Sequence, residues 1–306
     1  MYDAKSLLLH TKDRTQQKAI LKKYLRIIEI ECSSFCNRKC FFCPNSIIDR
    51  ASNNVTLDTG LYLNILEELK EIDYSGYVTY SRYNEPLAQK DFFLERLRQA
   101  RQFLPNARLH TNTNGDYLTQ SYLDELVLAG LNSLYLQQYL DEGEVFGTRT
   151  LQSKMLNRMA SLNLVGTVET ESPELLRFKI QYKELEILYY ARDFLKNGCN
   201  RGGTLASMPS TVRTQPCYIP FTDIYIDYDG SIMPCCNVRH DVPTHQDFII
   251  DNVAETSVLT AFCSAKITSL RKRLAYAIET VPICNTCTFA CGYAPKNITS
   301  SLFNQS

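Results

Sequence analysis

The sequence lacks the features of a membrane, secreted or nucleic-acid-binding protein. No apolar run is long enough to span a bilayer, and the N-terminus MYDAKSLLLHTKDR has no apolar segment of signal-peptide length. The 33 basic and 33 acidic side chains cancel, so no excess of positive charge predicts contact with nucleic acid or an anionic membrane. We therefore expect a cytoplasmic protein with no nucleic-acid and no membrane partner.

Disulfides are equally unexpected, because a reducing cytosol keeps thiols free, and yet the chain has 12 cysteines. Cys199 separates an N-terminal group from a C-terminal group. The first group is Cys32, Cys36, Cys40 and Cys43, and the second is Cys217, Cys235, Cys236, Cys263, Cys284, Cys287 and Cys291. Clustered thiols in a reduced compartment indicate metal ligation, so we expect two metal centres.

The first two thirds of the chain alternate strand-like and helix-like segments. The patterns predict strands over 26–31, 76–82, 107–115, 131–140 and 176–182, and helices over 57–72, 91–104 and 120–130. Repeated β-α units imply a parallel sheet with right-handed crossovers. We expect an α/β fold, a partial (β/α)6 TIM-like barrel, with its active site at the C-terminal ends of the strands.

The character of the chain changes after residues 202–216, a linker-like stretch rich in Gly, Ser, Thr and Pro. The Asp-Gly at 229–230 predicts a β-hairpin, and a helical pattern covers 264–280. Two strands and a helix are too little to build a core, so this module depends on its metal and on packing against the barrel. We predict a barrel domain over 1–205 and a metal-binding module over 206–306.

The spacing C-x3-C-x2-C of Cys36, Cys40 and Cys43 follows the first strand directly. Three thiolates on one loop can hold three irons of a [4Fe–4S] cluster and leave the fourth iron open. A closed zinc site, the alternative, requires four ligands in paired spacing, which this loop does not supply. Cys32 is available as a fourth ligand, but its place at the strand end favours a buried, inert thiol.

This loop, with Phe42 before its last cysteine, resembles that of the radical S-adenosylmethionine (SAM) superfamily. YNEPL (83–87) follows the second strand, where that superfamily has Gly-Gly-Glu-Pro, and TNTNGDYL (111–118) follows the third, where Thr-Asn-Gly is common. The resemblance implies that the open iron binds the methionine part of SAM, and that reduction gives a 5′-deoxyadenosyl radical. It implies SAM contacts by Phe42 at the adenine, by Tyr83, Asn84 and Glu85 at the methionine amine, and by Asn114 and Gln138.

Both family glycines are missing from YNEPL, where Tyr83 and Asn84 replace them. Glycine serves where the backbone needs a positive φ or a close approach to a ligand. Asn tolerates the left-handed conformation better than other residues, so we expect Asn84 to substitute for glycine in this way. An ordinary turn at the strand end is the alternative for this segment.

The C-terminal cysteines resemble the SPASM/twitch auxiliary-cluster domain. In its twitch form that domain binds one [4Fe–4S] cluster, and the resemblance assigns the ligands here as Cys217, Cys235, Cys284 and Cys287, with Cys291 or Cys236 as possible replacements. A zinc ribbon is the alternative, because four cysteines in a hairpin module also suit zinc.

Within the twitch group, the chain most resembles the 2-deoxy-scyllo-inosamine dehydrogenases of aminoglycoside biosynthesis. The resemblance rests on CNRKCFFCPNS, YNEPL, TNGDYL, the spacing Cys217-x17-Cys235 and the NRGG of 200–203. It implies that Arg201 contacts the substrate; an ion pair at the barrel end is the alternative. Strand alternation separately places Glu29 and Glu31 on one face, where they can bind substrate or act as a base, or remain solvated.

The resemblance implies a dehydrogenase that takes hydrogen from a carbinol carbon of an aminocyclitol or sugar and passes an electron to the auxiliary cluster. An external donor such as flavodoxin or ferredoxin would reduce the first cluster. One alternative is a sugar epimerase with a cysteine hydrogen donor, for which Cys199 and Cys236 lie near the predicted mouth. A second alternative is a ribosomal-peptide-modifying enzyme, although the roughly 25 residues before the first strand are too few for a leader-binding domain. A third is a zinc-stabilised binding module.

Overall fold

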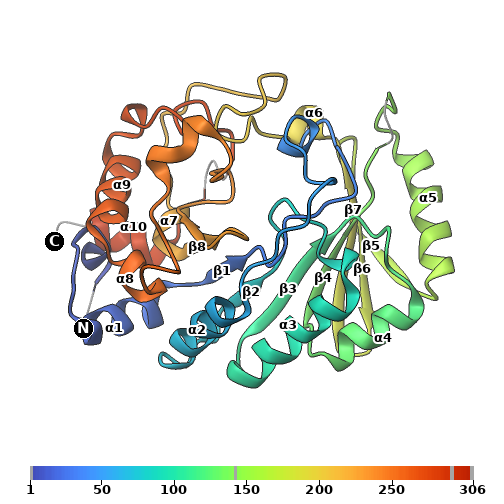
Figure 1. The fold of residues 1–306 in the computed structure, drawn as a ribbon. Helices are drawn as coiled ribbons and strands as arrows, with labels where there is room; N and C mark the ends of the chain where they lie inside the picture. The colour runs from blue at the N-terminus through green and yellow to red at the C-terminus, as the bar shows by residue number, and fades with distance from the viewer. Residues whose placement is uncertain (1–2, 141–142, 290–292, 304–306) are drawn as a thin grey trace.

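A single sheet of ten strands forms the centre of the computed structural model, which describes residues 3–140, 143–289 and 293–303 (Figure 1). Its order is β10-β9-β8-β1-β2-β3-β4-β7-β6-β5. The strands are β1 (Ile27–Ile30), β2 (Tyr77–Thr79), β3 (Arg108–Thr113), β4 (Ser133–Gln137), β5 (Gly166–Ser172), β6 (Leu175–Tyr182), β7 (Leu185–Arg192), β8 (Asp223–Ile226), β9 (Ser231–Met233) and β10 (Asp251–Asn252).

The middle of the sheet is parallel, from β8 through β1, β2, β3 and β4 to β7. The remaining strands are antiparallel and lie at the two edges, β9 and β10 on one side and β6 and β5 on the other. The sheet does not close, since β10 and β5 are its edge strands. The predicted α/β fold, a partial barrel with a C-terminal iron–sulfur region, is confirmed.

Two strands differ from the prediction in how they pair. Residues 176–182 belong to β6, which is antiparallel to both neighbours, and the parallel strand of that unit is β7. Residue alternation is the same in parallel and antiparallel strands, so it could not give the direction. The first strand of the predicted hairpin, β8, pairs with β1 and therefore continues the central sheet. The hairpin turn is as predicted, with Gly230 at φ 86°.

Helices cover the outer face of the sheet, with α2, α3 and α4 lying side by side across it (Figure 1). The helices are α1 (Arg14–Tyr24), α2 (Thr59–Lys70), α3 (Lys90–Phe103), α4 (Gln120–Leu128), α5 (Thr148–Ser161), α6 (Phe194–Asn197), α7 (Ile219–Thr222), α8 (Val258–Phe262), α9 (Ala265–Tyr276) and α10 (Lys296–Phe303). Asp58, Thr119 and Ser264 cap α2, α4 and α9 by accepting backbone N–H bonds. The predicted helix 264–280 ends early, at Tyr276.

The opposite side of the sheet, which we call the inner face, carries polar side chains. On β7 every second residue is buried, whereas Leu188, Tyr190 and Arg192 remain partly exposed. Asn112 on β3 and Gln137 on β4 alternate with buried neighbours in the same way. One face of these strands therefore packs into the helices, and the other is free to line a site.

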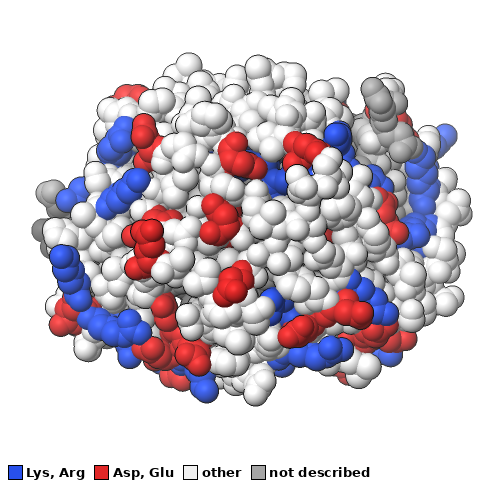
Figure 2. All heavy atoms as spheres, in the orientation of Figure 1, with Lys and Arg blue, Asp and Glu red and all other residues white. Residues whose placement is uncertain are grey.

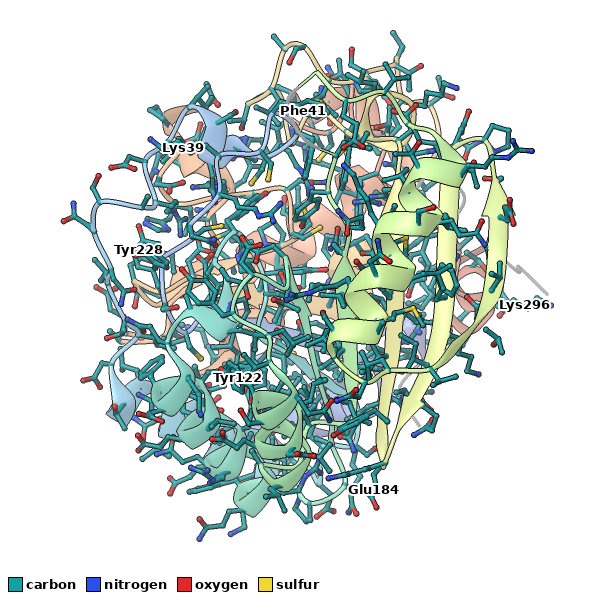
Figure 3. All side chains as sticks on the ribbon, turned by 90° about the vertical axis from the view of Figure 1, so that its right-hand side faces the viewer. Lys39, Phe41, Tyr122, Glu184, Tyr228 and Lys296 are labelled. Atoms are coloured by element: carbon teal, nitrogen blue, oxygen red, sulfur yellow. The ribbon has the colours of Figure 1, made fainter. Side chains whose placement is uncertain are left out.

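The loops at the C-terminal ends of the parallel strands share one end of the molecule. Lys39 and Phe41, on the loop after β1, lie at the top of Figure 3, whereas Glu184, in the turn before β7, lies at the bottom. Active sites of open α/β sheets lie outside the carboxyl ends of the strands, so the upper end is where a site is expected.

Acidic and basic side chains are interspersed over the face in Figure 2, without a region of one sign. Within the described ranges, no helix combines the length and the hydropathy that crossing a membrane requires.

Candidate active site

The cysteine loop that follows β1 lines a cavity of about 300 Å³ with Cys36, Cys40 and Cys43. Two backbone hydrogen bonds fix the loop, from Cys36 N to the Arg50 carbonyl oxygen (3.0 Å) and from Cys43 N to the Cys40 carbonyl oxygen (2.9 Å). Cys32 does not line this cavity; it is 3% exposed in the main core, as expected of an inert thiol. The structure thus brings together the three cysteines of the C-x3-C-x2-C motif.

The Sγ atoms of these three thiols do not all lie within 4.8 Å of one another. Burial is the main cause of the raised pKa values of the Cys36 thiol (about 11) and the Cys40 thiol (about 12), and neighbouring thiols of the loop contribute to both. A tetrahedral zinc ion, with Zn–S bonds of about 2.3 Å, requires sulfurs less than about 4.6 Å apart. Among the described residues, the one set of three or more His, Cys, Asp or Glu with ligand atoms within 4.8 Å of one another is Asp227, Asp229 and His240.

Tyr83, Asn84 and Glu85, the predicted contacts of the methionine amine, all line the same cavity. The Glu85 carboxylate accepts hydrogen bonds from the Thr113 hydroxyl (2.6 Å) and from the Asn114 backbone N–H (2.8 Å). It is 3% exposed, and burial raises its pKa to about 7. No ion pair within the described ranges involves Glu85, so this buried carboxylate lacks a cationic partner there.

The prediction that Asn84 replaces glycine by adopting a left-handed conformation is wrong, because Asn84 is not among the described residues with a positive φ. Its side chain closes the turn instead. The Oδ1 atom accepts a hydrogen bond from Arg82 N (3.1 Å), and the Nδ2 atom donates to the Tyr80 carbonyl oxygen (3.3 Å). Asn84 therefore replaces glycine with a side chain that stabilises the turn by hydrogen bonds.

Phe42 lies in a small apolar cluster separate from the main core. Its ring stacks on Phe194, with 3.5 Å between centroids and 3° between planes, and Tyr139 is 5.0 Å away. All three rings line the cavity, and Cys40 and Cys43 pack against the cluster. An aromatic wall beside the cysteine loop is what an adenine ring requires.

The two amide residues predicted to contact SAM have different positions. Asn114 lines the cavity, and its Nδ2 atom donates to the Asn37 Oδ1 atom (2.9 Å). Gln138 does not line it; Tyr189 donates to its side chain (2.7 Å), and Gln137 occupies the cavity wall. The prediction for Gln138 is wrong by one residue, because β4 ends at Gln137 and the alternation places that residue on the inner face.

Arg201 lines the cavity from a strained turn. It has φ 50°, and Gly202 and Gly203 follow with φ 64° and 88°. Its Nη1 atom donates to the Asn237 Oδ1 atom (3.1 Å), while its buried Nε atom has no hydrogen-bond partner. An ion pair, the alternative considered for Arg201, is not present within the described residues. A non-glycine residue held at positive φ in a cavity suggests a functional role.

Glu29 and Glu31 do not share an environment. Glu29 lines the cavity and accepts a hydrogen bond from the Thr79 hydroxyl (3.1 Å), and its buried Oε1 atom has no hydrogen-bond partner. Burial raises the pKa of Glu29 to about 7, against the opposing charge of Arg82, whose Nη1 atom lies 3.9 Å away.

Glu31 is fully buried and does not line the cavity. It accepts hydrogen bonds from Tyr83 N (2.9 Å) and from Arg50 Nη1 (3.3 Å). These partners tie the cysteine loop to the turn after β2. The expectation that Glu31 contacts substrate is therefore not met, because Glu31 is buried in the core and does not reach the cavity.

The four cysteines predicted to hold the auxiliary cluster, namely Cys217, Cys235, Cys284 and Cys287, come together beside this cavity. Burial raises the pKa of the thiols of Cys235 (to about 12), Cys284 and Cys287 (to about 11), and the other thiols of the set, Cys217 among them, contribute to these shifts. Backbone N–H groups of Asn237 and Phe289 donate to the sulfurs of Cys235 and Cys287, both at 3.4 Å. Such N–H···S bonds are typical of thiolates that hold iron–sulfur clusters.

The cysteines that were not assigned to either cluster lie in different environments. Cys236 lines the cavity, whereas Cys263 lies in the main core. Cys199 is 7% exposed, and its Sγ atom donates to the Asn237 Oδ1 atom at 3.6 Å. Cys291 lies outside the described residues.

Sequence reasoning missed several residues of the site: Arg82, Gln137, Arg192, Arg213 and Asn237. Arg82 pairs with Asp227 (2.5 Å), and Arg213 holds the cysteine loop of the C-terminal region by donating to the Phe289 carbonyl oxygen (2.6 Å). The alternation over 185–192 would have placed Arg192 on an inner face, had that segment been recognised as a strand. No local pattern identifies Arg82 or Asn237, because their partners are distant in sequence.

Two family models match the chain in the same two regions. The Radical SAM superfamily model matches residues 30–138, and the SPASM model, an iron–sulfur cluster-binding domain, matches residues 217–288. These two domains imply S-adenosylmethionine and two iron–sulfur clusters as cofactors, in agreement with the two cysteine sets.

A curated relative from Niallia circulans is the S-adenosyl-L-methionine-dependent 2-deoxy-scyllo-inosamine dehydrogenase. It is 25% identical over 255 residues, which are 83% of this chain and 88% of the relative. The crystal structure of BtrN in complex with AdoMet and 2-DOIA has a TM-score of 0.64 at 24% identity, over 87% of this chain and 94% of that one. BtrN in an open conformation has a TM-score of 0.58 at 21% identity, over 86% and 92%. The chain therefore contains a Radical SAM domain followed by a SPASM iron–sulfur cluster-binding domain.

Proposed function

We propose that the protein is a radical SAM dehydrogenase that oxidises a carbinol carbon of a small polyhydroxylated substrate, an aminocyclitol or a sugar, to a ketone. One observation carries the proposal. The cavity that contains Cys36, Cys40 and Cys43 is also walled by Cys236 and Phe289, which adjoin the auxiliary cysteines. A substrate in this cavity would lie next to both cysteine sets.

The roles of the residues follow from this placement. Cys36, Cys40 and Cys43 would hold the SAM-binding cluster, and Cys217, Cys235, Cys284 and Cys287 the auxiliary cluster. Phe42, Tyr83, Asn84, Glu85 and Asn114 would contact SAM. When bound, these groups supply hydrogen-atom abstraction and a one-electron acceptor.

Oxidation of a carbinol to a ketone removes one hydrogen atom from carbon, one proton from oxygen and one electron. The proton is the part that a side chain of this protein can take. Glu29 lines the cavity, its Oε1 atom has no hydrogen-bond partner, and its pKa of about 7 is close to the ideal value for a base at neutral pH. Arg201, which stays protonated, would orient the substrate hydroxyls with its unpaired Nε–H.

The relative that acts on 2-deoxy-scyllo-inosamine makes that compound the first substrate to test. We place the enzyme in the cytoplasm, where its thiols stay reduced, with flavodoxin or ferredoxin as the external electron donor. We also propose a boundary between residues 205 and 206, which falls between the regions that the two family models match.

A radical epimerase is a second candidate, favoured by the Cys236 thiol in the cavity wall. An epimerase returns a hydrogen atom to the substrate carbon, and a thiol is a suitable donor. The reaction in D2O separates the two. Solvent deuterium on an inverted carbon indicates the epimerase, and a carbonyl product without deuterium indicates the dehydrogenase.

The proposal is tested with anaerobically reconstituted protein, SAM, a reductant and 2-deoxy-scyllo-inosamine. We expect about eight irons per chain and release of 5′-deoxyadenosine. Replacing Cys36, Cys40 and Cys43 by Ala should remove about half the iron and all cleavage of SAM, and Cys235→Ala should spare cleavage but stop ketone formation. Cys263→Ala is the control. Cleavage of SAM that survives the triple replacement would contradict the assignment.

A further inference from the structure

A second cavity, of about 460 Å³, lies beside the first and shares two residues with it, Tyr190 and Arg192. Its wall also includes Tyr135, Glu174, Arg177 and Leu188. The two spaces are therefore neighbours, and the C-terminal part of β7 contributes to the wall of both.

The second cavity exists because the inner face continues past the parallel strands. Tyr135 on β4, Leu188 on β7 and Arg177 on β6 are the partly exposed members of alternating strands. Antiparallel β6 pairs with β7, and in this way the β5–β6 hairpin extends the same surface beyond the first cavity. In Figure 3 these strands form the right-hand part of the sheet.

The chemistry of this wall suits a hydroxylated ring. Tyr135 and Tyr190 meet edge to face, with 6.0 Å between ring centroids, and Tyr135 also packs edge to face on His110 at 4.4 Å. Aromatic rings offer flat apolar surface to the C–H face of a sugar, while nearby polar groups bond its hydroxyls.

Charge in the second cavity favours a neutral or acidic ring over an amino sugar. Arg177 pairs with Glu169 at 3.2 Å, and Glu174 pairs with Lys196 at 3.6 Å. Arg192, in contrast, has no ion pair within the described residues, and its buried Nε atom has no hydrogen-bond partner. Its guanidinium only stacks on the Phe194 ring, 4.3 Å from the centroid. A partly buried guanidinium without an acceptor calls for an anionic or acceptor-rich ligand.

We propose that the second cavity is a substrate subsite for a neutral or acidic sugar ring, and that Arg192 binds an acceptor group of this ring at the junction of the two cavities. The substrate is then a glycoside of the cyclitol or sugar that is oxidised in the first cavity, not the free single ring. This inference rests on the proposed function for the identity of the first ring.

The test measures binding to the reconstituted holoenzyme with SAM by anaerobic calorimetry. The probes are 2-deoxy-scyllo-inosamine and its glucoside, glucuronide and glucosaminide. We expect the glucuronide to bind at least about tenfold tighter than the single ring, and the glucosaminide to gain nothing. Arg192→Gln and Leu188→Trp should reduce the preference for the glucuronide to about one, the first by removing the donor and the second by filling the cavity.

Val165→Trp, at an exposed position outside both cavities, is the matched control and should keep the preference. Iron content and visible absorbance show that each variant retains its clusters. Equal binding of all four probes, a preference for the glucosaminide, or a preference that survives both variants would overturn the subsite. Release of 5′-deoxyadenosine is assayed separately and tests the proposed function. A failure of the subsite can therefore be distinguished from a failure of the proposed function.

Discussion

Arg201 and Asn237 connect the cavity to the auxiliary cysteines through one side-chain amide. Arg201 Nη1 donates to the Asn237 Oδ1 atom at 3.1 Å, and the Nδ2 atom of the same amide lies 3.8 Å from the Cys287 Sγ atom. Asn237 is 3% exposed, so neither contact is shared with bulk water. A residue that orients the proposed substrate contact therefore also donates to a proposed cluster ligand.

Asn237→Asp keeps the shape and the contact to Arg201 but removes the N–H donor to Cys287. Hydrogen bonds to cluster sulfurs raise the reduction potential, so we expect a more negative potential for the auxiliary cluster. Ketone formation should fall by about 10–100-fold, the usual effect of losing a partner of a metal ligand, while SAM cleavage persists. A redox titration followed by electron paramagnetic resonance measures the potential, with exposed Asn106→Asp as the control. An unchanged potential would show that the 3.8 Å contact has no electronic effect.

Glu29→Gln should change how stability depends on pH. Burial raises the pKa of Glu29 from 4.5 to about 7, so between these values the folded state holds a proton that the unfolded chain has released. Stability then falls as pH rises from about 4.5 to 7, by about 3 kcal/mol in total, and stays at the lower level above that range. The variant does not lose stability in this way, so its free energy of unfolding relative to that of the wild type should increase from pH 5 to pH 8.

Urea unfolding of the reconstituted protein at pH 5, 6, 7 and 8 measures this difference. Glu95→Gln, on the exposed side of α3, is the control and should follow the wild type. A constant difference between Glu29→Gln and the wild type across this range would mean that Glu29 is ionised throughout.

The parts of the site that could be predicted are those fixed by neighbours in sequence. The spacing of Cys36, Cys40 and Cys43, and the Asp-Gly turn at 229–230, specify local geometry, and both are as expected. The two partial exceptions are also local. Asn84 supports its turn by hydrogen bonds and not by a left-handed φ, and Gln137 replaces Gln138 because one residue reverses the face of a strand.

The parts that could not be predicted depend on pairing between distant segments. Alternation marks 176–182 as a strand but does not say whether it is parallel, and β8 joins β1 across nearly 200 residues of chain. Strand alternation placed Glu31 on the same face as Glu29, and therefore beside the substrate. It could not predict that Arg50, from a distant loop, binds the Glu31 carboxylate in the core. Arg82 acquires its role from Asp227, and Asn237 from Arg201 and Cys287, all of them distant in sequence, so no short pattern encodes either role.

Gly202→Ala and Gly203→Ala form a matched pair that tests the strained turn behind Arg201. Both glycines have positive φ, 64° and 88°, so each alanine should cost about 1–2 kcal/mol of stability. A Cβ at Gly202 would also lie 2.9 Å from the His245 Nε2 atom, whereas nothing lies within 4 Å at Gly203. His245 is fully buried and cannot move aside easily, because its Nε2 atom bonds the Gly202 carbonyl oxygen (3.0 Å) and its Nδ1 atom accepts from Arg239 N (3.1 Å).

We therefore expect Gly202→Ala to be less stable than Gly203→Ala by at least about 1 kcal/mol, and to raise the KM for substrate because Arg201 shifts. Thermal unfolding and steady-state kinetics of the two variants provide the comparison. Equal losses in both would indicate that only the backbone conformation matters and that the contact with His245 does not.

Glu85→Gln should weaken the binding of SAM by about 10–100-fold, since a hydrogen bond to an ionised carboxylate contributes about 1.5–3 kcal/mol. The carboxylate accepts hydrogen bonds from Thr113, Leu87 N and Asn114 N but has no ion pair within the described residues, so the amino group of SAM would be its cationic partner. Burial raises the pKa of Glu85 to about 7, and only the ionised form accepts both N–H bonds well. The advantage of the wild type over the variant should therefore grow from pH 6 to pH 8, which anaerobic calorimetry with SAM measures. The exposed substitution Glu95→Gln controls for the loss of one charge. An affinity ratio that stays constant across this pH range would place the binding contribution of residues 83–85 in their backbone and not in the Glu85 carboxylate.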